Sequence, residues 1–426
     1  MTKTHEHTNG AGISGGTARV RRIATVLVDR SNYGRMWPVM REIQKDPALR
    51  LLTVCAGTML LSRFGQAEHV VEADGFPIES RVYLEVEGSV PATMAKSIGL
   101  GISEFATEFQ RLRPHVVLLI GDRYEALAAA IAAAYMNIPL AHIQGGEVSG
   151  SIDECARHAI TKFAQLHFPA TQRSAEYLIR MGEPAETVFN FGCPAGDYIL
   201  DLDSSLPEDL FCRNGVGTSI SPNAPFFLVV YHPVTTDYGA ERERVVALLK
   251  ALDDLGHPTV WLWPNVDAGS DDISKVLRTY REHHEDTWLH LVKNLDPRTF
   301  QKCLRRTVCA IGNSSSFIRD SAFSGTPVVL VGERQFGREH SDNLVFAPAR
   351  REAIRSAISR QLEIGRRQPS FLYGDGTASK RIAEKLRTFQ FRTQKHLSYV
   401  SEVAASKTAT AVGGENGFIG AALATI

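Results

Sequence analysis

Short apolar runs alternate with helical patterns along most of this chain. In the first half the runs predict strands at 22–29, 49–55, 115–121, 140–143, 167–170 and 188–191. The intervening patterns predict helices at 36–45 and 91–111, a helix from Tyr124 to the Asn137-Ile138-Pro139 stop, a helix ending at Ala164, and a helix at 174–181. Continuous apolar runs are typical of strands buried on both faces, and this alternation is typical of βαβ units with parallel sheets.

The alternation stops at 201–225, which is rich in Asp, Ser, Pro, Asn and Gly, and then resumes. The second series predicts strands at 226–231, 259–263, 290–292, 308–311 and 327–331, and helices at 241–255, 273–284, 297–305, 317–323, 351–364 and 378–391. We therefore expect an α/β protein with two Rossmann-like domains facing a central cleft. The expected boundaries are a disordered tail at 1–20, a first domain at 21–200, a linker at 201–225, a second domain at 226–392 and a flexible tail at 393–426.

Composition narrows the classes of partner. The chain has 426 residues, with 47 Lys and Arg against 47 Asp and Glu. This balance argues against a nucleic-acid partner, and the absence of a long apolar segment or secretory leader argues against a membrane partner. The six cysteines are scattered without zinc-ligand or disulfide-framework spacing, which predicts a reduced, cytoplasmic protein.

Charged residues follow two of the predicted first-half strands. Asp122 and Arg123 end the run at 115–121, and the run at 140–143 leads to a longer polar segment. That segment carries Gln144, Glu147, Asp153, Arg157 and His158. Because ligands of open α/β sheets bind outside the carboxyl ends of the strands, these residues predict one side of an active site. The alternative is that Asp122 and Asp153 only cap helices, a role worth about 1 kcal/mol each.

The second half has its own polar loops at strand ends. Gly312 and Asn313 are followed by three serines at a strand-to-helix junction, which predicts an anion site at a helix N-terminus rather than an ordinary single-Ser cap. Arg334 and Arg338 follow the next strand and suit diphosphate, unless they are only solvated surface charges. The loop at 263–269 offers polar groups for a base or ribose, and His232 ends a strand, although a lone histidine is more often structural.

Two common nucleotide motifs are missing. Neither the GxGxxG pattern of NAD and FAD sites nor the GxxxxGK[ST] phosphate loop occurs. We therefore expect no cofactor and no metal.

Several motifs taken together resemble the hydrolysing UDP-N-acetylglucosamine 2-epimerase family. They are RSNYG, GDRYEALAAA, GGEVSGSIDE with RHAITK, FGCP, YHP, PNVDAGS, IGNSSSFIRDSAF and GERQFGRE, and they span roughly 22–387. The resemblance implies a GT-B-like fold with UDP in the cleft, held mainly by the second domain. It also implies elimination of UDP followed by hydration of a glycal-type intermediate, which releases a free 2-epimerised acetamido sugar.

The resemblance assigns roles to individual positions. Asp122, Asp153 and His232 occupy catalytic positions, and Glu147 is a further candidate base. The expected substrate contacts are Arg30, Arg123, Gln144, Arg157, His158, Asn265, Asp267, Ser314, Ser315, Ser316, Arg319, Arg334, Arg338 and Glu339. A UDP-sugar is the expected partner, and we expect a homodimer or homotetramer.

The chain departs from the family pattern at two places. Gln144 stands where some relatives have an acid in an HIEGGE pattern, and a glutamine cannot act as a general base. Either Glu147 or Asp122 then does that work, or the activity is altered. RSNYG also replaces a commoner RADYG-type sequence. The alternatives are a non-hydrolysing epimerase of a UDP-N-acetylhexosamine, a GT-B UDP-sugar glycosyltransferase, or a silent sugar-nucleotide sensor.

Overall fold

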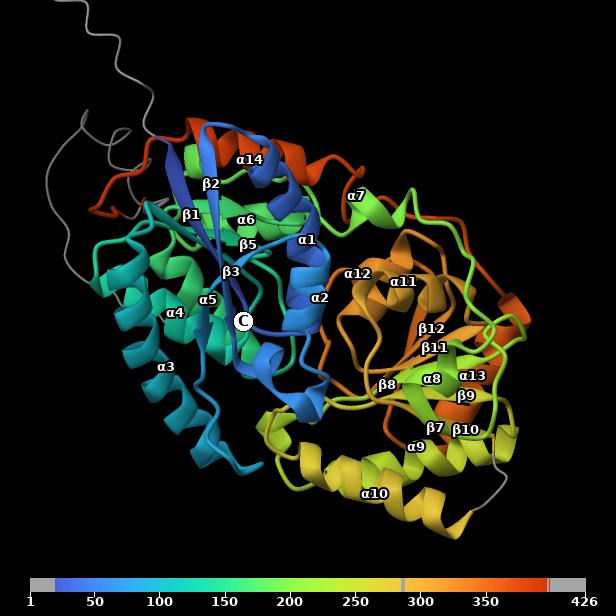
Figure 1. The fold of residues 1–426 in the computed structure, drawn as a ribbon. Helices are drawn as coiled ribbons and strands as arrows, with labels where there is room; N and C mark the ends of the chain where they lie inside the picture. Colours follow the sequence, from blue (N-terminus) through green and yellow to red (C-terminus); the bar gives the residue numbers. More distant parts are fainter. Residues whose placement is uncertain (1–19, 285–287, 397, 399–426) are drawn as a thin grey trace, which may run out of the picture.

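The computed structural model describes residues 20–284, 288–396 and 398. Two sheets, each sandwiched by helices, lie side by side with a cleft between them (Figure 1). The predictions for 1–19 and 399–426 lie outside the described residues. No helix of the described part is long and apolar enough to cross a membrane.

The first domain is built on a parallel sheet with strand order β3-β2-β1-β4-β5-β6. Its strands are β1 (Arg21–Leu27), β2 (Leu49–Ala56), β3 (Ile78–Val82), β4 (Val116–Ile120), β5 (Leu140–Ile143) and β6 (Leu166–Phe168). Its helices are α1 (Arg30–Lys45), α2 (Glu68–Ala73), α3 (Pro91–Leu112), α4 (Tyr124–Tyr135), α5 (Asp153–Phe163), α6 (Gln172–Arg180) and α7 (Gly196–Ile199). One face of the sheet packs on α1, and the other packs on α3 and α4.

The second domain repeats this plan. Its sheet has the order β13-β12-β11-β8-β9-β10-β7, parallel except for β7. The strands are β7 (Gly215–Gly217), β8 (Phe227–Val230), β9 (Thr259–Leu262), β10 (Leu289–Val292), β11 (Cys309–Gly312), β12 (Val328–Val331) and β13 (Leu344–Ala347). The helices are α8 (Leu210–Asn214), α9 (Glu241–Leu255), α10 (Ser270–His283), α11 (Pro297–Arg306), α12 (Ser316–Ala322) and α13 (Arg351–Ile364), and the chain ends its regular structure with α14 (Ala378–Thr388), which packs on the first domain. Helices α11 and α12 cover one face, and α9, α10 and α13 cover the other.

Both sheets reverse their winding at an inner strand pair. The reversal lies between β1 and β4 in the first sheet and between β8 and β11 in the second. A crevice opens at such a switch point, because the connections on its two sides leave toward opposite faces. The fold therefore fixes two facing positions where loops can form a site.

Several expected elements differ from the structure. Helix α1 begins at Arg30 rather than at residue 36, because the Asp29 carboxylate caps it by accepting from Asn32 N at 2.7 Å. Pro38 consequently lies in the interior of the helix. The run at 188–191 forms only an isolated bridge from Val188 to His167, and β3 and β13 were not predicted.

The connections between the domains also differ from the expectation. The predicted linker contains α8 and β7, and β7 joins the second sheet by antiparallel pairing with β10. Helix α14 does not close the second domain. It crosses back to cover the first (Figure 1), where Ile382 and Leu386 are fully buried with residues of α1. The predicted flexible tail begins with an anchored residue, since Lys395 Nζ lies 2.6 Å from the buried Glu183 carboxylate.

Candidate functional site

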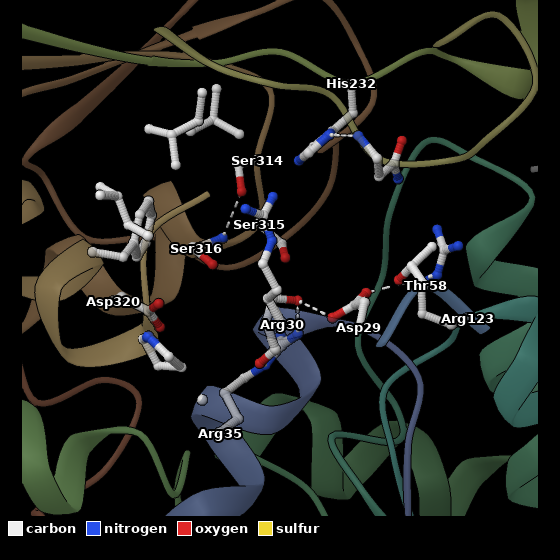
Figure 2. Close-up of a pocket in the computed structure, with 18 of the residues that line it drawn as sticks. Asp29, Arg30, Arg35, Thr58, Arg123, His232, Ser314, Ser315, Ser316 and Asp320 are labelled. Carbon is white, nitrogen blue, oxygen red and sulfur yellow. Dashed lines mark hydrogen bonds and ion pairs between the residues drawn. The ribbon is translucent and has the colours of Figure 1, made fainter. Parts of the chain in front are cut away.

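A cavity lies between the two domains, at the facing switch points. Its first-domain wall follows β1, β4 and β5, and its second-domain wall follows β8, β9 and β11. Figure 2 shows side chains of both walls, among them Arg30 and Arg123 on one and His232 on the other. Ten of the predicted site residues line it: Arg30, Asp122, Arg123, Asp153, His232, Asn265, Ser314, Ser315, Ser316 and Arg334. Residues predicted from two separate halves of the sequence thus meet at one site.

The first-domain wall presents two carboxylates in opposite electrostatic environments. Asp122 receives hydrogen bonds from Arg157, whose Nε lies 3.1 Å from Oδ2. Burial raises the pKa of Asp122, but Arg157, Arg338 and Arg319 outweigh burial and lower it well below its usual range. The pKa of Asp153 is raised, chiefly by burial and by the charges of Asp122 and Asp267, against the opposing effect of Arg334.

The capping explanation for these two residues is wrong. The N-cap of α4 is Arg123 and that of α5 is Ile152, and neither helix start has a side-chain cap hydrogen bond. Asp153 is instead held by Ser151 Oγ at 2.9 Å and by Arg334 Nη2 at 3.1 Å. Two carboxylates whose pKa values are pushed apart are a common arrangement for acid–base chemistry.

The serine loop after β11 provides hydroxyl groups on the opposite wall. Ser315 is the N-cap of α12 but makes no capping bond. Its hydroxyl accepts from Arg319 Nη2 at 2.8 Å, and Ser314 Oγ accepts from Ser316 N at 3.4 Å. Together with Arg30 and Arg334 in the cavity lining, the loop presents donors suited to an anionic group.

His232 sits on the same wall in its neutral form. Burial, followed by Arg334, Arg30 and Arg123, lowers its pKa well below the usual value. Its Nδ1 accepts from the backbone N–H of Asn265 at 3.2 Å, so the proton of the neutral ring is on Nε2. His232 can therefore donate a hydrogen bond from Nε2 without carrying a positive charge.

Eight predicted site residues do not belong to the cavity lining of the described chain. Asp267 is buried beneath it, where Oδ1 accepts from Arg123 Nη1 at 2.5 Å across the domain boundary. Gln144 is fully buried and accepts from Arg35 Nη1 at 3.2 Å. The others are Glu147, Arg157, His158, Arg319, Arg338 and Glu339.

Most of these residues lie behind the cavity lining and contact lining residues or one another. Arg157 orients Asp122, and Glu147 is ion-paired with Arg319 and Arg338. Glu339 accepts from Thr171 across the domain boundary. His158 pairs with Glu154 on its own helix, with Nε2 and Oε1 3.5 Å apart.

The sequence interpretation missed several groups that line the cavity. Arg35 and Asp320 are both buried there, and Gln301 Nε2 donates to Asp320 Oδ2 at 2.7 Å. Burial raises the pKa of Asp320 despite Arg35 nearby. Both residues lie one helical turn after the recognised loops, within or next to the motifs RSNYG and IGNSSSFIRDSAF, and this spacing is the signal that could have found them.

Comparison with known proteins agrees with this geometry. The sequence profile of the family "UDP-N-acetylglucosamine 2-epimerase" matches residues 41–387. The chain is 34% identical over 375 residues to the UDP-N,N'-diacetylbacillosamine 2-epimerase (hydrolyzing) of Legionella pneumophila, covering 88% of this chain and 98% of that protein. It is 26% identical to the UDP-N-acetylglucosamine 2-epimerase of Neisseria meningitidis, covering 86% and 94%.

Solved structures share the fold. The Methanocaldococcus jannaschii UDP-GlcNAc 2-epimerase, in complex with UDP-GlcNAc and UDP, superposes with a TM-score of 0.71 at 14% identity, covering 86% of this chain and 99% of that one. The N. meningitidis enzyme bound to UDP-GlcNAc gives 0.68 at 18% identity, with 86% and 99% covered. The fold is GT-B-like, as the sequence predicted. The chain belongs to the UDP-N-acetylglucosamine 2-epimerase family.

Proposed function

We propose that this enzyme is a hydrolysing 2-epimerase of a UDP-linked 2-acetamido sugar. The observation that carries the proposal is the opposition of two unlike carboxylates, Asp122 and Asp153, to an anion-binding serine loop across one interdomain cavity. The Legionella pneumophila relative, at 34% identity, and a Campylobacter jejuni relative, at 30% identity over 327 residues, are both named as hydrolyzing enzymes. These names favour release of the sugar over its return to UDP.

Elimination is the first step. Asp153 is suited to take the C2 proton, because a base with a raised pKa is the stronger proton acceptor once it is ionised. The C1–O bond to UDP breaks as the C1–C2 double bond forms, and the leaving diphosphate gains negative charge. Arg30, Arg334, the serine loop and His232 all line the cavity, and in this proposal their N–H and O–H groups stabilise that charge.

Hydration completes the reaction. Water adds its oxygen to C1 while a proton returns to C2 on the opposite face, which gives UDP and a free sugar inverted at C2. Asp122 stays ionised beside Arg157 and serves as a fixed negative charge near the reacting carbons.

The substrate is either UDP-N-acetylglucosamine or a UDP-2,4-diacetamido sugar. The Legionella pneumophila and Campylobacter jejuni relatives, at 34% and 30% identity, are both named as N,N'-diacetylbacillosamine 2-epimerases, which favours the second. NMR time courses on each substrate in deuterated water, without an acceptor, test the proposal. We expect UDP and a free sugar carrying deuterium at C2. A product still attached to UDP, or no reaction without an acceptor sugar, would contradict it.

We further propose a cytoplasmic enzyme that forms a homodimer or homotetramer. All six cysteines are free thiols, which supports a reducing compartment. Light scattering coupled to size-exclusion chromatography tests the assembly, and a monomeric mass at micromolar concentration would exclude it.

A further inference from the structure

We infer that Glu147 is a positioning residue, which couples closure of the two domains to assembly of the anion-binding loop. The inference rests on the proposed function only where it concerns turnover. Its binding and closure predictions stand on geometry alone.

Glu147 lies on the loop between β5 and α5, with 4% of its surface exposed. Its Oε2 accepts from Arg319 Nη1 at 2.5 Å and also from Arg338 Nη1. Both arginines belong to the second domain. Among the described residues, neither guanidinium forms an ion pair with any other carboxylate.

The contact continues from Arg319 to the cavity. While Nη1 of Arg319 donates to Glu147, Nη2 donates to the hydroxyl of Ser315 at 2.8 Å, and Ser315 lines the cavity. A carboxylate of the first domain therefore fixes the orientation of a hydroxyl in the anion loop of the second.

The backbone carbonyl of Glu147 is linked to the first-domain wall of the cavity. Arg157 Nη1 donates to the Glu147 carbonyl at 2.6 Å, and Arg157 Nε donates to Asp122 at 3.1 Å. Arg157 thus links Glu147 to the Asp122 carboxylate, and Arg319 links it to the anion loop.

The surrounding backbone depends on the same closed arrangement. Gly150 N donates to Arg334 O at 3.0 Å, and a Cβ at Gly150 would come within 2.2 Å of Glu333 O. The loop carrying Glu147 can therefore lie against the Arg334 loop only because residue 150 has no side chain.

The contact between Glu147 and the two arginines should affect domain closure because it is a buried ion-pair cluster. Removing one partner of a buried ion pair leaves uncompensated charge, which disfavours the closed state strongly. If only the closed state binds UDP fully, the measured affinity falls in proportion to the closed population. Neutralising Glu147 should weaken UDP binding although its carboxylate does not line the cavity.

Three variants test the inference: Glu147→Gln, Arg338→Gln and the double variant. The matched control is Glu176→Gln, a removed carboxylate on the surface of α6. UDP affinity is measured by calorimetry and domain closure by small-angle scattering with saturating UDP. Exchange of the C2 proton is followed by NMR at saturating sugar nucleotide.

We expect Glu147→Gln to weaken UDP binding by about tenfold or more, with a less compact UDP-bound form, because both arginines lose their carboxylate. Arg338→Gln should weaken UDP binding less, because Glu147 keeps its ion pair with Arg319. The double variant should bind UDP no more weakly than Glu147→Gln, because the loss of the Glu147 carboxylate already removes its ion pairs with both Arg319 and Arg338. C2 exchange at saturation should persist with an unchanged pH profile, and the control should match wild type.

Two outcomes would overturn the inference. Wild-type UDP affinity and compactness in both single variants would show that the contact does not control closure. Loss of C2 exchange in Glu147→Gln with UDP affinity intact would make Glu147 the base. If Glu147→Gln does not fold, the binding result for Arg338→Gln decides. Failure of the proposed function would instead appear in wild type, as a missing reaction with UDP binding intact.

Discussion

The two walls of the cleft share one topology but carry different chemistry. Each wall lies at the switch point of a similarly wound sheet, after β1 and β4 on one side and after β8 and β11 on the other. The first-domain wall supplies the carboxylates Asp122 and Asp153. The second supplies hydroxyls and a neutral histidine, His232. The fold therefore determines where a ligand lies, and the loop residues determine what each side does to it.

The largest expected effect is a loss of turnover when a carboxylate of the first-domain wall is neutralised and the second-domain wall is left unchanged. Asp153→Asn and Asp122→Asn should each lower turnover by ~10²-fold or more, because proton transfer and its supporting charge are lost. UDP affinity should stay within a few-fold of wild type, since Arg30, Arg334 and the serine loop, the groups proposed to bind the diphosphate, are unchanged. Steady-state kinetics and calorimetry measure the two quantities, and a parallel collapse of UDP binding would contradict the division.

The converse change addresses the second wall. Arg334→Ala, and separately Ser314→Ala combined with Ser315→Ala, should weaken UDP binding, because charge-assisted hydrogen bonds are worth about 1.5–3 kcal/mol each. Arg334→Ala should also affect turnover, since Arg334 pairs with Asp153. The serine variant, which leaves that pair intact, is the cleaner test, and unchanged UDP affinity in it would remove the loop from the diphosphate site.

The pH dependence of turnover should follow the ionisation of Asp153 on the first wall. Asp153 must be ionised to accept the C2 proton, and its pKa is raised. Turnover should therefore fall about tenfold per pH unit below that pKa and level off above it. The depressed pKa of Asp122 keeps that group ionised over the same range.

A variant of Arg334 tests whether Asp153 is the group that titrates, because the positive charge of Arg334 lowers the pKa of Asp153. Arg334→Gln should move the acid limb to higher pH, whereas the serine variant should leave it in place. A limb that stays unmoved in Arg334→Gln would indicate that another group titrates.

Sequence patterns predicted the fold class well and the site in part. Buried parallel strands such as 115–121 are continuous apolar runs, so both sheets and their polar ends could be recognised. The crossing of α14 to the first domain could not, because an amphipathic helix does not specify which sheet covers its apolar face. Likewise Asp267 and Arg319 were predicted as substrate contacts, and only the structure shows that Asp267 accepts from Arg123 and that Arg319 donates to Ser315.

The smallest expected effect concerns Gln144, the position where some relatives keep an acid. Its side chain is fully buried, accepts from Arg35 Nη1 at 3.2 Å and donates to Cys193 Sγ at 3.2 Å. In Gln144→Glu the new carboxylate would keep Arg35 as a partner and lose only the weak bond to sulfur. We therefore expect turnover within a few-fold of wild type and a melting temperature within a few degrees.

Gln144→Ala is the matched control. It leaves Arg35 Nη1 without this acceptor and should cost about 1–3 kcal/mol of stability. Because residue 144 lies behind the lining rather than in it, neither variant should alter C2 exchange directly. A tenfold gain in exchange for Gln144→Glu would instead show that a carboxylate here reaches the substrate, and that the first wall can hold a third catalytic acid.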